Sequence, residues 1–162
     1  MEQMKIENVE ISKRSAKRNI KMTTVYADIT APLYWWKDFY PFKSDVVDCD
    51  YDLIAVGKDF TLDDFAYQNM GSMELELLGK TIDLLNYQKH LYIKTGDAVW
   101  KTKIIQTLPM SYMLKGTIMV NYGLLTSIYF TNRYSFLNEW TEFCEWIRSL
   151  PQGEAICRDR RK

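Results

Sequence analysis

The sequence predicts a single α+β domain over residues 1–155, in which a small antiparallel sheet packs against helices. Segments rich in β-branched residues and segments with helical apolar spacing follow one another without a regular βαβ order. The 162 residues are 47% hydrophobic and 14% aromatic, which provides for one dense core and for an aromatic pocket or interface. Residues 156–162 are basic and are predicted to form a flexible tail.

Charge and composition exclude several classes of function. The chain carries 21 basic and 21 acidic residues, and this balance argues against a general nucleic-acid binder. We find no signal peptide and no apolar run long enough to span a membrane, so we expect a cytoplasmic protein without a membrane partner. Three cysteines without metal-type spacing and one histidine, His90, predict no metal site and no catalysis by histidine. Basic clusters at residues 13–21 and 158–162 are interpreted as a solvated turn and a terminus, with phosphate binding as the alternative.

Two strands and an aromatic helix are predicted first. Met4–Ile11 reads as a strand, residues 12–19 as a polar connection, and residues 20–29 as a second strand that pairs antiparallel with the first. Residues 31–42 hold six aromatic residues among twelve positions. Pro32 suits the first turn of a helix, Thr30 suits its N-cap, and Pro41 ends it.

The next segment, residues 43–58, has no regular pattern. The spacing of Asp48, Asp50 and Asp52 is that of a calcium loop, but Leu53 replaces the turn glycine and Asp59 replaces the final glutamate. We therefore interpret these residues as a solvated acidic loop or an exposed strand face, without a metal.

The second half is predicted to be mainly helical. Thr61 caps a helix start, and Ser72–Lys94 is a long amphipathic helix ended by Gly96. Its buried stripe is expected to contain Leu75, Leu78, Ile82 and Leu85, widened by Leu77, Leu84, Leu91 and Tyr92. Asp97 caps a helix over Ala98–Thr107.

A strand and two helices complete the prediction. Met113–Asn121 reads as a third strand, and Tyr122–Asn132 continues as a helix. Leu137–Leu150 is the final helix, with Trp140, Phe143, Cys144 and Ile147 at helical spacing, and Pro151 with Gly153 ends it.

This order of elements resembles the flavin-dependent thymidylate synthases over roughly residues 20 to 150. The matching stretches are Asp28-Ile29-Thr30-Ala31-Pro32-Leu33-Tyr34, Leu108-Pro109-Met110-Ser111-Tyr112, residues 117–125 around Asn121, and Asn138-Glu139-Trp140. The resemblance implies their fold and a homo-oligomer, since that family works as a homotetramer with its sites between subunits. The chain is also similar to uncharacterised proteins of bacteria and phages that share Ile29-Thr30-Ala31-Pro32-Leu33-Tyr34-Trp35-Trp36-Lys37.

The family's signature motif, Arg-His-Arg-x-x-Ser-x-Asn-x-x-Ser-x-Arg, is replaced in this chain. Arg-His-Arg falls on Pro41-Phe42-Lys43, the first Ser on Val46, the Asn on Asp48, the second Ser on Tyr51, and the last Arg on Leu53. Only Lys43 keeps a similar charge, and it lacks the bidentate fork of arginine. The resemblance therefore implies no methyl transfer and no resident flavin cofactor.

The candidate ligand-binding residues combine ring faces with cations. Trp35, Trp36 and Tyr40 are expected to stack on a base, and Lys37, Lys43, Lys115 and Arg133 to meet phosphates, with Ser111 and Asn121 in the matching stretches. Arg133 lies near the place where the family has an arginine that reads the nucleotide phosphate. The alternative is that Trp35 or Trp36 belongs to the core or to a subunit interface, because neighbouring helical positions point about 100° apart.

Three functions follow from these residues. The first is a non-catalytic protein that binds or sequesters a nucleotide. The second is a phage- or mobile-element-encoded protein that binds and inhibits a host defence protein. The third is a divergent flavoenzyme, which the joint loss of acid–base and phosphate-gripping residues argues against.

Overall fold

The computed structural model describes residues 4–12, 20–42, 45–49 and 58–158. They group into two compact units. Unit 1 contains Met1–Ala31, Trp35–Cys49 and Lys115–Lys162, and unit 2 contains Pro32–Tyr34 and Asp50–Leu114. We describe each unit by itself, and the single domain over residues 1–155 stays a prediction.

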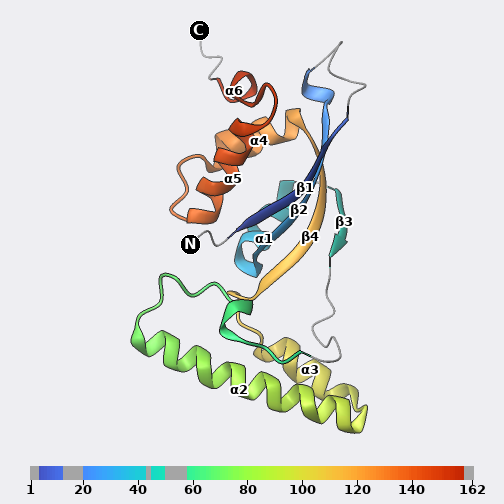
Figure 1. The fold of residues 1–162 in the computed structure, drawn as a ribbon, viewed down its shortest axis with the longest axis vertical. Helices are drawn as coiled ribbons and strands as arrows, with labels where there is room; N and C mark the ends of the chain where they lie inside the picture. The colour runs from blue at the N-terminus through green and yellow to red at the C-terminus, as the bar shows by residue number, and fades with distance from the viewer. Residues whose placement is uncertain (1–3, 13–19, 43–44, 50–57, 159–162) are drawn as a thin grey trace. The chain divides into compact units, whose positions relative to one another are not determined.

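A four-stranded sheet with the order β1-β2-β4-β3 forms the centre of unit 1 (Figure 1). β1 (Lys5–Ile11) pairs antiparallel with β2 (Thr24–Pro32), and β3 (Asp45–Cys49) pairs antiparallel with β4 (Met113–Asn121). β1 and β3 are therefore the two edge strands. The predicted pairing of the first two strands is confirmed, and β3 lies in the segment that the sequence left as loop or exposed strand.

The two central strands also run in opposite directions. The backbone N–H of Tyr122, just after β4, donates to the carbonyl of Thr23, just before β2, at 2.9 Å. Near the middle of the two strands, the hydroxyl of Thr117 in β4 donates to the carboxylate of Asp28 in β2 at 2.6 Å. The end of β4 thus lies beside the start of β2, and the sheet is antiparallel, as the sequence predicts.

Helices cover one face of this sheet because its side chains alternate between buried and more exposed positions. The buried positions are Val25, Ala27, Ile29, Leu114, Ile118 and Val120. Figure 1 shows α4 (Tyr122–Asn132) and α5 (Asn138–Ser149) on one side of the sheet. Both helices match the predicted segments, and the α+β class is confirmed.

The aromatic segment begins differently from its prediction. β2 continues through Pro32, and Thr30 pairs with Lys5 in the sheet, so Thr30 is not a helix cap. The helix α1 covers Leu33–Phe39, and a 3₁₀ turn at Tyr40–Phe42 ends it around Pro41. Another 3₁₀ turn, Ile20–Met22, precedes β2, which therefore starts later than the alternating pattern suggests.

The end of unit 1 also corrects the sequence prediction. Gly153 does not end a helix but starts a short one, α6 (Gly153–Ile156). Ile156 and Cys157 are buried, so the packed part of the chain extends beyond residue 155. Residues 159–162 of the predicted tail lie outside the described residues, as do residues 13–19, 43–44 and 50–57, which include Asp50 and Asp52 of the predicted acidic segment.

Unit 2 is built around α2 (Ser72–Thr95) and α3 (Ala98–Thr107), which pack against each other. Gly96 adopts the left-handed conformation, with φ +67°, and its N–H donates to the Tyr92 carbonyl at 2.8 Å. The Asp97 side chain accepts from the Val99 N–H at 2.9 Å and caps α3. Both predicted helices and both predicted caps are confirmed.

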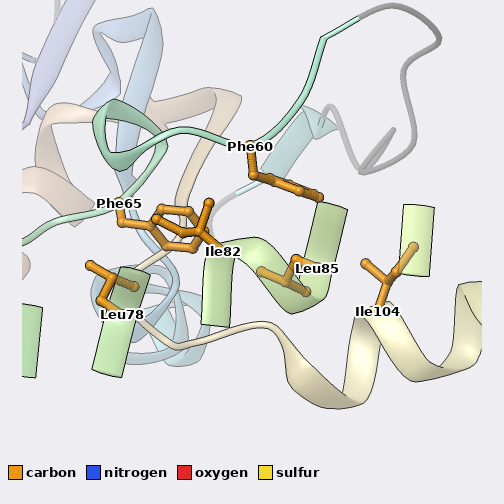
Figure 2. Close-up of a cluster of buried hydrophobic side chains, with 6 residues drawn as sticks. All are labelled: Phe60, Phe65, Leu78, Ile82, Leu85 and Ile104. Carbon is orange, nitrogen blue, oxygen red and sulfur yellow. The ribbon is translucent and has the colours of Figure 1, made fainter. Parts of the chain in front are cut away.

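The core of unit 2 lies along one side of α2. Figure 2 shows its six buried side chains, Phe60, Phe65, Leu78, Ile82, Leu85 and Ile104. The predicted stripe of Leu78, Ile82 and Leu85 is therefore confirmed. The predicted widening by Leu77 and Leu84 is wrong, because both side chains are exposed. Thr61 caps only a 3₁₀ turn, Leu62–Asp64, where its N–H donates to the Asp64 carboxylate at 2.7 Å.

Candidate functional site

An aromatic cluster fills the interior of unit 1. Trp35 and Trp36 have exposed fractions of 0% and 1%. The Trp35 ring lies 4.9–5.3 Å, centroid to centroid, from its aromatic neighbours Trp36, Phe39, Trp140 and Phe143. The structure therefore supports the alternative that the sequence left open, in which these rings belong to the core. It corrects the prediction that Trp35 and Trp36 stack on a ligand, since neither ring offers a face to one.

A cleft of about 360 Å³ lies between β1 and α5 in unit 1. Its wall on the β1 side is apolar, from Met4 and Ile6. Its wall on α5 carries two carboxylates, an indole ring and a hydroxyl, from Glu142, Glu145, Trp146 and Ser149. These α5 residues share one side of the helix because their spacing of three and four residues returns to the same face. The cleft combines negative charge with an aromatic surface.

Contacts behind the cleft fix its walls. The backbone N–H of Met4 donates to the Glu142 carboxylate at 3.1 Å, which ties the start of the sheet to α5. The Trp146 ring lies 5.1 Å from the buried ring of Phe143, centroid to centroid. The Ser149 hydroxyl donates to the Trp146 carbonyl at 2.7 Å. Glu142, Trp146 and Ser149 are therefore held in place before any ligand arrives, which lowers the entropic cost of binding.

Lys115, one of the predicted phosphate contacts, lies on the sheet beside an acid. Its ammonium is 3.4 Å from the Asp28 carboxylate, which also accepts from Thr117 at 2.6 Å and from the Asn8 side chain at 2.8 Å. The Thr117 and Asn8 hydrogen bonds lower the pKa of Asp28, partly opposed by desolvation, and the charge of Lys115 adds a smaller effect. Asp28 thus stays ionised and balances the charge of Lys115.

Arg133 follows α4, and two aromatic rings border its guanidinium. The guanidinium carbon is 4.8 Å from the centroid of Phe130 and 4.9 Å from that of Tyr134. Tyr134 and Phe136 have exposed fractions of 85% and 92%. An exposed ring beside a guanidinium can stack on a planar group and meet its charge, and ligand binding at Arg133 stays a prediction.

Each of the other predicted residues has its own local surroundings. Asn121 caps α4, where its side chain accepts from the Leu124 N–H at 2.8 Å. Lys37 and Tyr40 are exposed on and after α1. Ser111 belongs to unit 2, and its buried hydroxyl has no hydrogen-bond partner among the described residues. Lys43 lies outside the described residues.

Nucleophiles and metal ligands are poorly placed in the described part of the chain. Burial raises the pKa of the Cys144 thiol to about 12, and burial also raises the pKa of Cys157. His90 is exposed on α2, 2.8 Å from the Asp59 carboxylate. Within the described residues, no three histidine, cysteine or acidic side chains gather as metal ligands would. No helix in the same residues is long and apolar enough to cross a membrane.

The fold is that of the flavin-dependent thymidylate synthases. One similar structure is the flavin-dependent thymidylate synthase ThyX of Helicobacter pylori complexed with FAD and dUMP, with a TM-score of 0.60 and 11% identity over 85% of this chain and 72% of that one. A second structure of Helicobacter pylori ThyX with FAD and dUMP gives a TM-score of 0.59 and 12% identity over 86% and 76% of the two chains. No protein-family model and no curated protein matches the sequence.

The sequence reasoning did not identify the cleft between β1 and α5. Glu142, Glu145 and Trp146 appear in the sequence within a predicted amphipathic helix, where charged residues usually mark the solvated face. The available signal is a tryptophan that follows two acidic residues on that face, since a large aromatic side chain is unusual there. That β1 would form the opposite wall depends on tertiary packing and has no local signal.

Proposed function

We propose that this protein is a non-catalytic binding protein whose cleft between β1 and α5 receives a cationic side chain of a partner protein. The observation that carries this proposal is the pairing of two carboxylates with an indole around one cavity. A lysine or arginine side chain gains charge-assisted hydrogen bonds from Glu142 and Glu145 and a cation–π contact from Trp146. A cavity of this volume suits one such side chain with its apolar stem against Met4 and Ile6.

The absence of catalysis is part of the proposal. Pro41 and Phe42, which stand where the signature has Arg-His, have no acid–base group. Burial keeps the thiols of Cys144 and Cys157 protonated, and protonated thiols are weak nucleophiles. A cleft lined by two glutamates repels phosphate, so it also does not suit the substrate class of the similar enzymes. A host protein with a basic surface is the partner we favour.

We expect an arginine-containing peptide amide labelled with fluorescein to bind this protein, and its citrulline counterpart to bind at least about tenfold more weakly, because citrulline lacks the charge. Fluorescence anisotropy measures both. The variant Glu142→Gln/Glu145→Gln keeps hydrogen-bond acceptors but removes both charges, and it should lose the preference for arginine.

The matched control is Glu74→Gln/Glu154→Gln, which makes the same change in net charge at exposed acids outside the cleft. It should bind the arginine peptide as the wild type does. Equal weakening by both double variants would mean that the attraction is a property of net charge, and the cleft would then have no specific role.

A second candidate function is nucleotide binding at Arg133, which the exposed Tyr134 ring beside its guanidinium favours. The similar enzyme structures contain FAD and dUMP, which supports this class of ligand. We expect thermal melting against flavins, uridylates and signalling nucleotides to show stabilisation by one class, about 2.7 kcal/mol at 100 times the dissociation constant. Arg133→Gln should remove the shift, whereas Arg148→Gln, an exposed arginine on α5, should keep it. No shift with any nucleotide would reject this candidate.

A further inference from the structure

The long helix α2 has a second apolar stripe, on the side away from its core. Met73, Leu77, Leu84 and Tyr87 have exposed fractions of 81%, 67%, 45% and 59%. At about 100° per residue these four positions fall within an arc of about 80°, and the core residues Leu78, Ile82 and Leu85 point about 150° away from its centre. A solvated helix face is normally polar, so four large apolar side chains in one row mark an interaction surface.

The spacing of this stripe is that of a helix-pairing seam. Met73, Leu77, Lys80, Leu84, Tyr87 and Leu91 follow one another at alternating intervals of four and three residues, which is the a/d pattern of a heptad repeat. The pattern continues over nearly three heptads of a 24-residue helix, about 36 Å long. The Tyr87 ring packs edge-on against Trp100 of α3, 6.3 Å between centroids, and extends the apolar surface beside the seam.

We propose that this seam pairs with the same seam of a second copy of the chain, in antiparallel orientation about Leu84. Charge selects this occupant and this direction. The first half of α2 carries three acids, Glu74, Glu76 and Asp83, against one lysine, Lys80, and the exposed lysine of the second half is Lys94. A parallel pair would place like charges side by side, whereas an antiparallel pair brings the acidic half of each helix to the basic half of the other.

Distances along the helix fit an antiparallel pair. Glu76 lies about 12 Å before Leu84 and Lys94 about 15 Å after it, on the same flank of the seam, so each Glu76 comes beside Lys94 of the second copy. Lys80 and Tyr87 lie about 6 Å and about 4.5 Å from Leu84 on opposite sides, so the ammonium of one copy meets the phenol ring of the other. Within one chain the Lys80 ammonium lies 2.6 Å from the Glu76 carboxylate. Because both groups are exposed to water, this ion pair contributes little to stability.

The first test is the oligomeric state as a function of concentration, measured by sedimentation equilibrium. We expect a dimer, and the variant Leu77→Glu/Leu84→Glu should raise its dissociation constant at least about 100-fold, because it buries unpaired charges in the seam. The control is Ile93→Glu, which introduces one such charge at an exposed residue of the same helix that points away from the seam. It should leave the dimer intact.

The second test determines whether the two α2 helices pair in antiparallel orientation. Leu84→Cys should form an intermolecular disulfide under mild oxidation, since the two-fold axis brings the two copies of this position together. Leu77→Cys should not cross-link above the wild-type background, because an antiparallel pair places it opposite residue 91. A monomer at every concentration, a dimer that survives Leu77→Glu/Leu84→Glu, or efficient cross-linking through both positions would overturn the proposal. None of these measurements depends on the cleft between β1 and α5.

Discussion

Trp35→Ala is expected to lower the free energy of unfolding by about 3–5 kcal/mol, the cost typical of removing a large aromatic side chain from a core. Trp35 is the centre of the aromatic cluster in unit 1, in contact with four other rings from α1 and α5. Its removal leaves a cavity that those rings can fill only by leaving their own positions. Urea unfolding followed by circular dichroism measures the change.

Phe136→Ala serves as the control for this prediction. Its ring is almost fully exposed, so the same kind of truncation should change the free energy of unfolding by no more than about 0.5 kcal/mol. A loss below about 1 kcal/mol for Trp35→Ala would show that the cluster tolerates a void, and would contradict the central place we give to this ring.

Gly153→Ala and Gly79→Ala are expected to change stability in opposite directions. A Cβ atom at Gly153 would lie 2.2 Å from the Ile147 carbonyl oxygen and 2.6 Å from that of Arg148, both of them backbone atoms that cannot rotate away. We expect a loss of about 1–3 kcal/mol as α6 is pushed off α5. Gly79 lies inside α2, and its Cβ would meet nothing within 4 Å, so alanine should gain about 0.5–1 kcal/mol.

Thermal and urea unfolding of the two variants, side by side with the wild type, measure both effects. The two substitutions add the same methyl group, so any general effect of alanine cancels in the comparison. A Gly153→Ala protein as stable as the wild type would mean that α6 does not need close contact with the end of α5.

Local patterns predicted the elements whose boundaries are set by local chemistry. Gly96 and Asp97 separate α2 from α3 because a left-handed residue and a side-chain cap act within a few residues. The helix that follows Asn121 is predicted from its apolar residues alone, and the sequence interpretation gives Asn121 a ligand role where the structure makes it the cap. Features of this kind need no knowledge of tertiary structure.

The errors occurred where distant segments decide the outcome. Thr30 looks like a helix cap, but pairing with β1 extends β2 past it. Trp35 and Trp36 look like a stacking platform, but both are buried, and Trp140 of α5, far along the sequence, packs against Trp35. Leu77 and Leu84 look like core because periodicity cannot distinguish a core-facing stripe from one that is left exposed. The candidate site was missed for the same reason, since its two walls meet only in the folded chain.

The two units alternate along the sequence, and this order affects how the protein folds during translation. Unit 1 begins with the first strands but needs Lys115 and the residues after it, whereas the residues between Asp50 and Leu114 belong to unit 2. Trp35 therefore leaves the exit tunnel long before Trp140 and Phe143, the rings of α5 that pack against it, have been synthesised. Unit 1 can complete its fold only after nearly all residues of both units have been synthesised. Until then its aromatic residues are exposed, and chaperones that bind exposed apolar segments can bind them.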